Sequence, residues 1–218
     1  FILHVGAAEP RKNLPLLIEA FARLPAAQRD GRAVVLAGAL QPDAVAALRE
    51  QAGRLGLGEV ALATPGFVDD DDLVALYGLC DALVFPSRLE GFGLPVLEAM
   101  ACGAPVLAAN ATSLPEVVGR PDVLFDPNDA DALAARLSGL LADRGRRDAL
   151  GRHGIERAAA FTWENAARRA IAAFEQLHER RRVRPPAAGP SRRRPRMAFV
   201  GALPPDTSRA AARAAALL

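Results

Sequence analysis

Residues 1–125 alternate short aliphatic runs with amphipathic stretches, and this alternation is the feature that most limits the folds open to the chain. The candidate strands are ILHV (2–5), AVVLA (33–37), VALA (60–63), ALVF (82–85), PVLAA (105–109) and VLF (123–125). Strands that alternate with helices predict a parallel sheet, because right-handed crossovers place helices on both of its faces. We therefore predict an α/β, Rossmann-like domain whose ligands bind beyond the carboxyl ends of the strands.

The segment NLPLLIEAFARL, residues 13–24, is typical of a helix packed on such a sheet. Its apolar residues fall on one helical face and comprise Leu14, Leu17, Ile18, Phe21 and Leu24. Asn13 stands just before the first turn, where a side-chain oxygen can accept hydrogen bonds from the free amides of a helix. We expect Asn13 to cap this helix.

The most informative loop follows the strand at 82–85. It reads RLEGFG, residues 88–93, and leads into the helical segment LPVLEAMAC, with Pro95 suited to the first turn and Gly103 to the end. Glu90 therefore lies in the loop and Glu98 on the helix. Because helical side chains lean toward the N-terminus of their helix, we expect both carboxylates to face one site.

This loop combines features that favour an anion with features that favour hydroxyl groups. Gly91 and Gly93 permit a close turn, and the free amides at the helix start favour a phosphate. Two carboxylates nearby favour a ligand that also carries paired hydroxyls, as a sugar does. The first loop, HVGAAEPRKN, lacks G-x-G-x-x-G, which disfavours a nicotinamide or flavin dinucleotide. The alternative interpretation is a plain turn with two solvated acids.

The acidic run DDDD, residues 69–72, has two interpretations. Carboxylate runs bind magnesium in another class of sugar transferases, but acids before LVALYGL also suit the first turn of a helix, whose dipole favours negative charge. We favour the helix start and expect no metal or other cofactor. Cys80 and Cys102 lie in apolar stretches without metal-type spacing, which indicates buried, reduced thiols. The histidines, interpreted as structural or solvated, are His4, His153 and His178.

Arginines concentrate in RRRVRPPAAGPSRRRPR, residues 180–196, which contains no acid. Proline, glycine and arginine with few large apolar residues cannot bury enough surface to order a chain, so residues 181–196 are predicted to form a flexible linker. A nucleic-acid or anionic-membrane contact is the alternative, but no aromatic residues interleave the arginines for base stacking. We therefore expect no nucleic-acid partner.

Length and composition allow one well-buried domain and a remainder, since the chain has 218 residues of which 51% are hydrophobic. No run of about 18 uninterrupted apolar residues occurs, and the opening residues lack the basic region and cleavage site of a signal peptide. We expect a cytoplasmic location, with peripheral contact at the inner face of the membrane as an open alternative.

The stretch EGFGLPVLEAMACGAPV, residues 90–106, closely resembles the E-x7-E region of family 4 retaining glycosyltransferases with the GT-B fold. The similarity covers nearly all of residues 1–180. The diphosphate-binding start of that family resembles HVGAAEPRKNLPLLIEAF. The segment before the motif resembles GFVDDDDLVALYGLCDALVFPS, and the segments after the motif resemble SLPEVVG and LFDPND. The segment EPRKN is similar to the corresponding segment of a bacterial mannosyl- or rhamnosyltransferase subgroup.

The resemblance implies the C-terminal, donor-binding half of a two-domain enzyme that transfers a hexose from a nucleotide diphosphate sugar to a hydroxyl acceptor with retention, in polysaccharide or glycan biosynthesis. Glu90 would contact the transferred sugar and Glu98 the ribose. Lys12, the only lysine in the sequence, would neutralise the diphosphate leaving group. The other implied donor contacts are Arg11 near the diphosphate, Gly66, Phe67 and Val68 at the nucleobase, and Gly91, Phe92, Gly93 and Leu94 along the phosphate loop.

The acceptor, a glycan or a lipid-linked sugar, would bind the half of the enzyme that precedes this one, so this chain alone would bind donor without turnover. Many family members carry an arginine directly after the glycine of the first loop, where this chain has Ala7. Arg11 or the other half would have to supply that charge.

The residues are also compatible with two other classes of protein. A nucleotide-binding module without catalysis fits the residues, as does a GT-B epimerase or phosphorylase, although a phosphorylase would need a cofactor-linked lysine in a different context from Lys12.

Residues 197–218 resemble the opening of another GT-B N-terminal half. We therefore divide the chain into a domain at 1–180, a linker at 181–196 and a truncated second Rossmann-like domain at 197–218.

Overall fold

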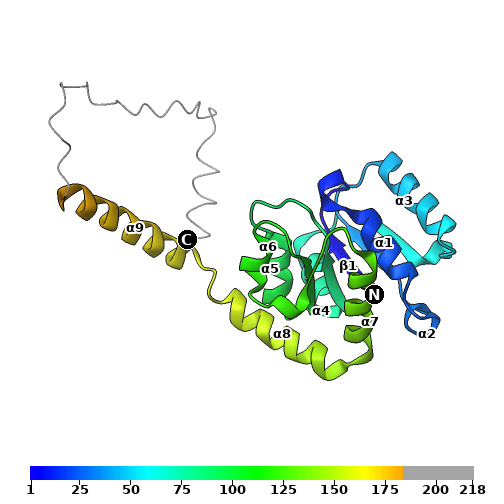
Figure 1. Cartoon of the computed structure of the whole chain (residues 1–218). Coiled ribbons are helices and arrows are strands. Elements are labelled where there is room, and N and C mark those ends of the chain that lie inside the picture. The colour runs from blue at the N-terminus through cyan, green and yellow to red at the C-terminus, as the bar shows by residue number, and fades with distance from the viewer. Residues whose placement is uncertain (184–218) are drawn as a thin grey trace. The chain divides into compact units, whose positions relative to one another are not determined.

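The computed structural model describes residues 1–183 (Figure 1). The chain divides into two units, with the boundary after Ala160. The first unit contains a six-stranded sheet in the order β3-β2-β1-β4-β5-β6, and every neighbouring pair is parallel. The strands are β1 (Ile2–Val5), β2 (Val34–Ala37), β3 (Leu62–Gly66), β4 (Ala82–Phe85), β5 (Val106–Ala109) and β6 (Leu124–Phe125). The predicted α/β, Rossmann-like parallel sheet is confirmed.

Helices connect the strands and cover the sheet. They are α1 (Leu14–Ala22), α2 (Ala26–Arg29), α3 (Pro42–Arg54), α4 (Asp70–Leu79), α5 (Leu94–Ala101), α6 (Leu114–Val118), α7 (Ala130–Ala142) and α8 (Arg144–Ala158), with 3-10 turns η1 (Pro10–Lys12), η2 (Glu59–Ala61) and η3 (Pro121–Val123). One group packs α1 against α3 and α7, and the other packs α5 against α4, α6 and α8. Figure 1 shows these two groups on either side of the sheet.

The apolar face predicted for α1 is buried in the core. The side chains predicted to share this face are all at most 3% exposed, and they are Leu14, Leu17, Ile18, Phe21 and Leu24. Burying each such side chain contributes roughly 1.5–3 kcal/mol. The helix is therefore firmly fixed on the sheet, and it holds the turn of η1 at the carboxyl end of β1.

Asn13 does not cap α1 with its side chain, which corrects the prediction. Its backbone is left-handed (φ 57°), a conformation that asparagine adopts more readily than most residues. Its side-chain Nδ2 donates to the carbonyl oxygens of Pro86 (3.2 Å) and Pro127 (2.7 Å). Because Pro86 follows β4 and Pro127 follows β6, Asn13 ties three loops together at the carboxyl edge of the sheet.

The third strand lies further along the chain than predicted. Glu59–Ala61 form the turn η2, and β3 begins at Leu62, which pairs with Val34 of β2. Val60 is largely exposed and takes no part in the sheet. Gly66 is consequently the last residue of β3 and not part of the loop after it.

The described part of the second unit is α9 (Trp163–Val183). It reaches three residues into the segment predicted as a linker, and the rest of that segment, together with residues 197–218, lies outside the described residues. Within residues 1–183, no helix combines the length and the apolar character needed to cross a membrane.

Glycines allow α8 to approach α5 closely. A Cβ atom on Gly151 would lie 2.5 Å from the carbonyl oxygen of Gly103, and one on Gly154 would lie 3.1 Å from Cα of Met100. Both of the facing positions are backbone atoms at the end of α5, which cannot move aside as a flexible side chain can. This contact fixes the helix that carries Glu98.

Gly151→Ala tests this packing. In an open helix the change gains up to about 1 kcal/mol of stability, but here we expect the free energy of unfolding to fall by about 1–3 kcal/mol because the added methyl group overpacks the contact. Urea denaturation followed by circular dichroism measures it. Gly53→Ala, in α3 with no atom within 4 Å of the added Cβ, is the control and should stabilise the chain. Equal effects of the two substitutions would contradict the close packing.

Candidate functional site

The sheet has one position at which the direction of strand connection reverses. From β1 the chain proceeds outward to β2 and β3, and then crosses back to β4 on the other side of β1. In open parallel sheets such a switch point leaves a crevice between the two loops that diverge from it. Here those loops are residues 6–13, after β1, and residues 86–93, after β4.

A buried ion pair joins the two loops. Nζ of Lys12 lies 2.8 Å from Oε1 of Glu90, and the side chain of each is only 9% exposed. A guanidinium nitrogen of Arg11 lies 3.2 Å from the same oxygen, although Arg11 is 39% exposed and also pairs with Glu9. Nζ of Lys12 also lies 4.8 Å from the ring centroid of Phe85, within the range of a cation–π contact. The structure therefore brings together three of the predicted site residues.

The surroundings of Glu90 keep its carboxyl group ionised. Burial disfavours the charged form, but the hydrogen bond from Lys12 and the positive charges of Lys12 and Arg11 outweigh burial and hold the pKa of Glu90 below its usual value. At neutral pH the crevice therefore holds a fixed negative charge beside a fixed positive one. Such a pair can bind a ligand that carries both hydroxyl groups and an anionic group.

The loop after β5 clamps the Glu90 loop, a contact that the sequence analysis missed. The backbone N–H of Glu90 donates to Oγ1 of Thr112 (3.0 Å). Oγ of Ser113 lies 3.2 Å from the carbonyl oxygen of Glu90 and 3.0 Å from that of Phe92. Thr112 has a left-handed backbone (φ 49°), which is unusual for a β-branched residue and marks local strain. The clamp joins loops more than 20 residues apart, so no local pattern predicts it.

Glu98 lies on α5 and has a hydrogen-bond partner that the sequence analysis did not name. The hydroxyl of Tyr77, on α4, donates to Oε2 of Glu98 at 2.9 Å. Burial, reinforced by the charge of Glu98, raises the pKa of Tyr77 above its usual value, so the hydroxyl stays protonated and remains a donor. Tyr77 is buried while Glu98 is exposed. The bond therefore orients a carboxylate that solvent can reach.

The start of α5, on the N-terminal side of Glu98, provides backbone donors. Gly93, with φ 97°, occupies the N-cap position, and the helix begins at Leu94 with Pro95 in its first turn. A Cβ atom on Gly93 would lie 2.8 Å from Cδ2 of Leu114, so this turn requires glycine. The amides of Gly93 and Leu94 stand at the positive end of the helix dipole, which favours an anion.

The residues predicted to meet a nucleobase lie at the same edge of the sheet but further along it. Gly66 ends β3, and Phe67 and Val68 follow it. Phe67 is 83% exposed, whereas Val68 packs partly against the core. Strand β2 lies between β3 and the strand that precedes Lys12, and both β2 and β1 lie between β3 and the strand that precedes Glu90. The structure thus places these residues along one edge without bringing them into contact with the ion pair.

The acidic run and the cysteines have structural roles. Asp69 caps α4 by accepting from the amide of Asp72 (2.9 Å), which confirms the predicted helix start. Among the described residues, no three His, Cys, Asp or Glu side chains are grouped to hold a metal ion. Both cysteines are free, and burial raises the pKa of Cys80 to about 12. Cys102, at the end of α5, is only partly buried, which corrects that prediction.

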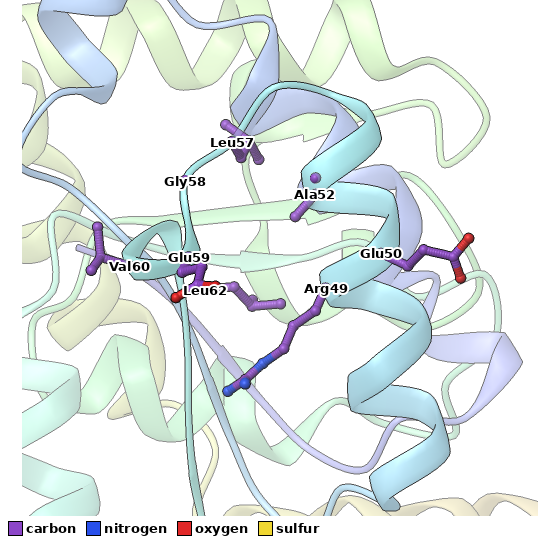
Figure 2. Close-up of a pocket in the computed structure, with 9 residues that line it drawn as sticks. Arg49, Glu50, Ala52, Leu57, Gly58, Glu59, Val60 and Leu62 are labelled. Carbon is purple, nitrogen blue, oxygen red and sulfur yellow. The ribbon is translucent and has the colours of Figure 1, made fainter.

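The structure also contains cavities away from these residues. One of about 610 Å³ lies between the end of α3 and η2 (Figure 2), and its lining includes Leu62, the first residue of β3. It is therefore at the amino end of the strand, opposite the edge that carries Lys12. Another, of about 640 Å³, lies beside β6. Neither is lined by a predicted site residue.

Comparison with known proteins agrees with this geometry. The profile of the family described as "Glycosyl transferases group 1" matches residues 1–157. The serotype-specific mannosyltransferase WbdA of Escherichia coli is 44% identical over 177 residues, covering 81% of this chain and 22% of WbdA. The O-antigen chain mannosyltransferase B of Escherichia coli is 40% identical over 179 residues, covering 81% of this chain and 46% of that protein.

Solved structures resemble the chain as well. HepE of Anabaena, crystallised with UDP and glucose, has a TM-score of 0.68 and 27% identity over 81% of this chain and 48% of HepE. The catalytic domain of the cholesterol-alpha-glucosyltransferase of Helicobacter pylori has a TM-score of 0.63 and 26% identity over 74% of this chain and 98% of that domain. The sheet is therefore a Rossmann-like half of the GT-B type. The chain belongs to the group 1 glycosyl transferase family, and it spans between about a fifth and a half of the two mannosyltransferases it matches.

Thr112→Val tests the clamp on the Glu90 loop. The change keeps the branched shape but leaves the exposed amide of Glu90 without its acceptor, so we expect the free energy of unfolding to fall by about 0.5–1.5 kcal/mol. Thr112→Ser keeps the acceptor oxygen and should lie close to the unmodified chain. Chemical denaturation of both variants measures the difference. Equal stability of the two variants would show that the hydrogen bond contributes nothing.

Proposed function

We propose that this domain binds a nucleotide diphosphate sugar at the β1/β4 crevice and, within the whole protein, transfers its hexose to a hydroxyl acceptor with retention at the anomeric carbon. The observation that carries the proposal is the buried Lys12–Glu90 pair, with a 2.8 Å separation, beside the start of α5. A cation, a carboxylate and helix amides at one crevice match the phosphate and hydroxyl groups of such a donor.

Lys12 would stabilise the diphosphate as it leaves. Negative charge grows on the leaving group when the bond to the anomeric carbon breaks, and a cation already held in a buried position stabilises that charge without reorganisation. The amides of Gly93 and Leu94 would share the anion. Retention would follow from departure and attack on the same face of the sugar, with the acceptor hydroxyl entering beside the diphosphate.

The two glutamates would bind different parts of the donor. Glu90, ionised and held by Lys12, would accept hydrogen bonds from hydroxyls of the transferred sugar. Glu98, oriented by Tyr77 and exposed to solvent, would accept from the ribose hydroxyls. Arg11 would add positive charge at the rim, and the segment from Gly66 to Val68 would meet the nucleobase. These assignments divide one extended ligand along one edge of the sheet.

Mannose is the proposed hexose, because the two Escherichia coli relatives are both mannosyltransferases. The acceptor is proposed to be a glycan or lipid-linked sugar bound by the remainder of the protein, in polysaccharide biosynthesis at the cytoplasmic face of the membrane. The name of the O-antigen chain mannosyltransferase supports that pathway class. The chain alone would then bind donor without turnover.

Nucleotide titration tests the donor site directly. We expect GDP, UDP, ADP or dTDP to bind the folded chain in isothermal titration calorimetry, and Lys12→Ala to weaken binding more than Arg11→Ala does. The reason is that Lys12 is buried beside the crevice whereas Arg11 is 39% exposed, and a buried charge-assisted contact is stronger than one that water reaches.

The proposal would be wrong if a sample with the circular dichroism spectrum of a folded protein gave no heat with any of the four nucleotides. Arg54→Ala is a matched control, since Arg54 is an exposed cation on α3 that pairs only with its helical neighbour Glu50 among the described residues. It should bind like the unmodified chain.

Two glutamine variants test the proposal that Glu90 and Glu98 bind different parts of the donor. Glu98→Gln should weaken the binding of the ribonucleotides GDP, UDP and ADP by about 1.5–3 kcal/mol, because it loses charge-assisted acceptance from the ribose. Glu90→Gln should bind the bare nucleotide almost normally, but weaken the nucleotide sugar and lower kcat in the full-length enzyme, since contacts to the departing sugar strengthen in the transition state. If Glu90→Gln weakened the bare nucleotide as much as Glu98→Gln did, the assignment would fail.

A further inference from the structure

His4 has a buried nitrogen without a hydrogen-bond partner. It lies in β1, is 0% exposed, and its Nδ1 lies 3.1 Å from the carbonyl oxygen of Val84 on β4. Because a carbonyl oxygen can only accept, Nδ1 carries the proton of the neutral ring and Nε2 carries a lone pair. Nε2 has no partner among the described residues. Buried polar atoms are rarely left in this state, so this one requires an explanation.

The unpartnered nitrogen lies near the ammonium group of Lys12, whose charge acts on the His4 ring. A Cβ atom placed on Gly6 would lie 3.6 Å from Nε2 of His4 and also 3.6 Å from Nζ of Lys12, so the two nitrogens flank the same point. The His4 ring stacks on Phe85 with centroids 5.2 Å apart, and Phe85 is the ring over which Nζ of Lys12 lies. Phe85 of β4 thus contacts both His4 of β1 and Lys12 of η1, next to the ion pair.

His4 is neutral in this position. Burial, assisted by the nearby charge of Lys12, lowers its pKa to about 4, even though the hydrogen bond to Val84 and the charge of Glu90 oppose the shift. The charged groups that face it are Lys12 and Glu90. At neutral pH the ring therefore has an acceptor available on the Lys12 side.

An ammonium group has three N–H donors and needs an acceptor for each when it is buried. The structure gives Lys12 one acceptor, Oε1 of Glu90. The inference rests on the proposed function, in which a bound diphosphate supplies the second acceptor. We propose that Nε2 of His4 is the third acceptor, and that His4 is a positioning residue which holds the Lys12 ammonium toward the diphosphate when the donor is bound.

The single lysine of the chain makes the inference measurable. Labelling with lysine that carries ¹⁵N at Nζ gives one ammonium signal in NMR, and the exchange of its protons with water reports their hydrogen bonding. With GDP or UDP bound, we expect Lys12 ammonium protons in His4→Phe to exchange about tenfold faster than in the unmodified chain, and the dissociation constant to rise about fivefold to tenfold, as for the loss of one hydrogen bond. Phenylalanine keeps a flat ring for stacking on Phe85 but has no acceptor.

His4→Gln is the conservative rescue, because its amide oxygen can accept near the position of Nε2, and it should stay within about twofold of the unmodified chain, less than one hydrogen bond. His153→Phe, which removes a ring on α8 bonded to Val118, should leave the Lys12 signal unchanged. A purely structural role would alter stability in His4→Phe while leaving ammonium exchange in the bound state unchanged.

A second measurement needs no substitution at all. In the unmodified chain with ¹⁵N-labelled histidine, the Nε2 signal of His4 should move upfield when GDP or UDP is added, as a nitrogen lone pair accepts a hydrogen bond. Normal nucleotide binding with an unmoved Nε2 signal, or with His4→Phe indistinguishable from the unmodified chain in affinity and exchange, overturns this inference alone. Absence of binding by the unmodified chain overturns both this inference and the proposed function.

Discussion

The ion pair between Lys12 and Glu90 is the interaction on which the arrangement of the crevice depends. Each charge offsets the cost of burying the other, and Arg11 adds a second positive charge beside Glu90. The pair joins loops that follow β1 and β4, and its members stand 78 residues apart in the chain. The neighbouring contacts keep those loops in position: Asn13 binds the loops after β4 and β6, and Thr112 binds the amide of Glu90.

The carboxyl edge of the sheet around this ion pair offers different kinds of contact at different places. At the switch point it offers fixed charge and helix amides, at Glu98 an exposed carboxylate oriented by Tyr77, and at Phe67 an exposed aromatic ring. A nucleotide sugar carries a diphosphate, a hexose, a ribose and a flat base. The proposal assigns the diphosphate and hexose to the switch point, the ribose to Glu98 and the base to the segment that contains Phe67.

The sequence predicted what depends on local periodicity. The buried face of α1 and the acidic first turn of α4 follow from spacing within a few residues and are present, and a strand lies at each of the six aliphatic runs, although the third begins at Leu62 and not at Val60. The placement of Glu90 in a loop and of Glu98 on α5 also follows from a local motif. The contact of Tyr77 with Glu98 and the clamp by Thr112 could not be predicted, because they join segments that meet only through the order of the strands. Asn13 was wrongly expected to cap α1, because its left-handed backbone and the hydrogen bonds that its Nδ2 donates to two distant loops orient the side chain away from the helix amides.

The measurement that tests the central claim most directly is a crystal structure of this chain with a nucleoside diphosphate sugar. The account predicts a diphosphate oxygen within hydrogen-bond distance of Nζ of Lys12 and of the amides at the start of α5, with sugar hydroxyls on Glu90 and ribose hydroxyls on Glu98. A donor bound elsewhere, for example in the cavity between α3 and η2 (Figure 2), or a diphosphate that contacts neither Lys12 nor α5, would contradict it.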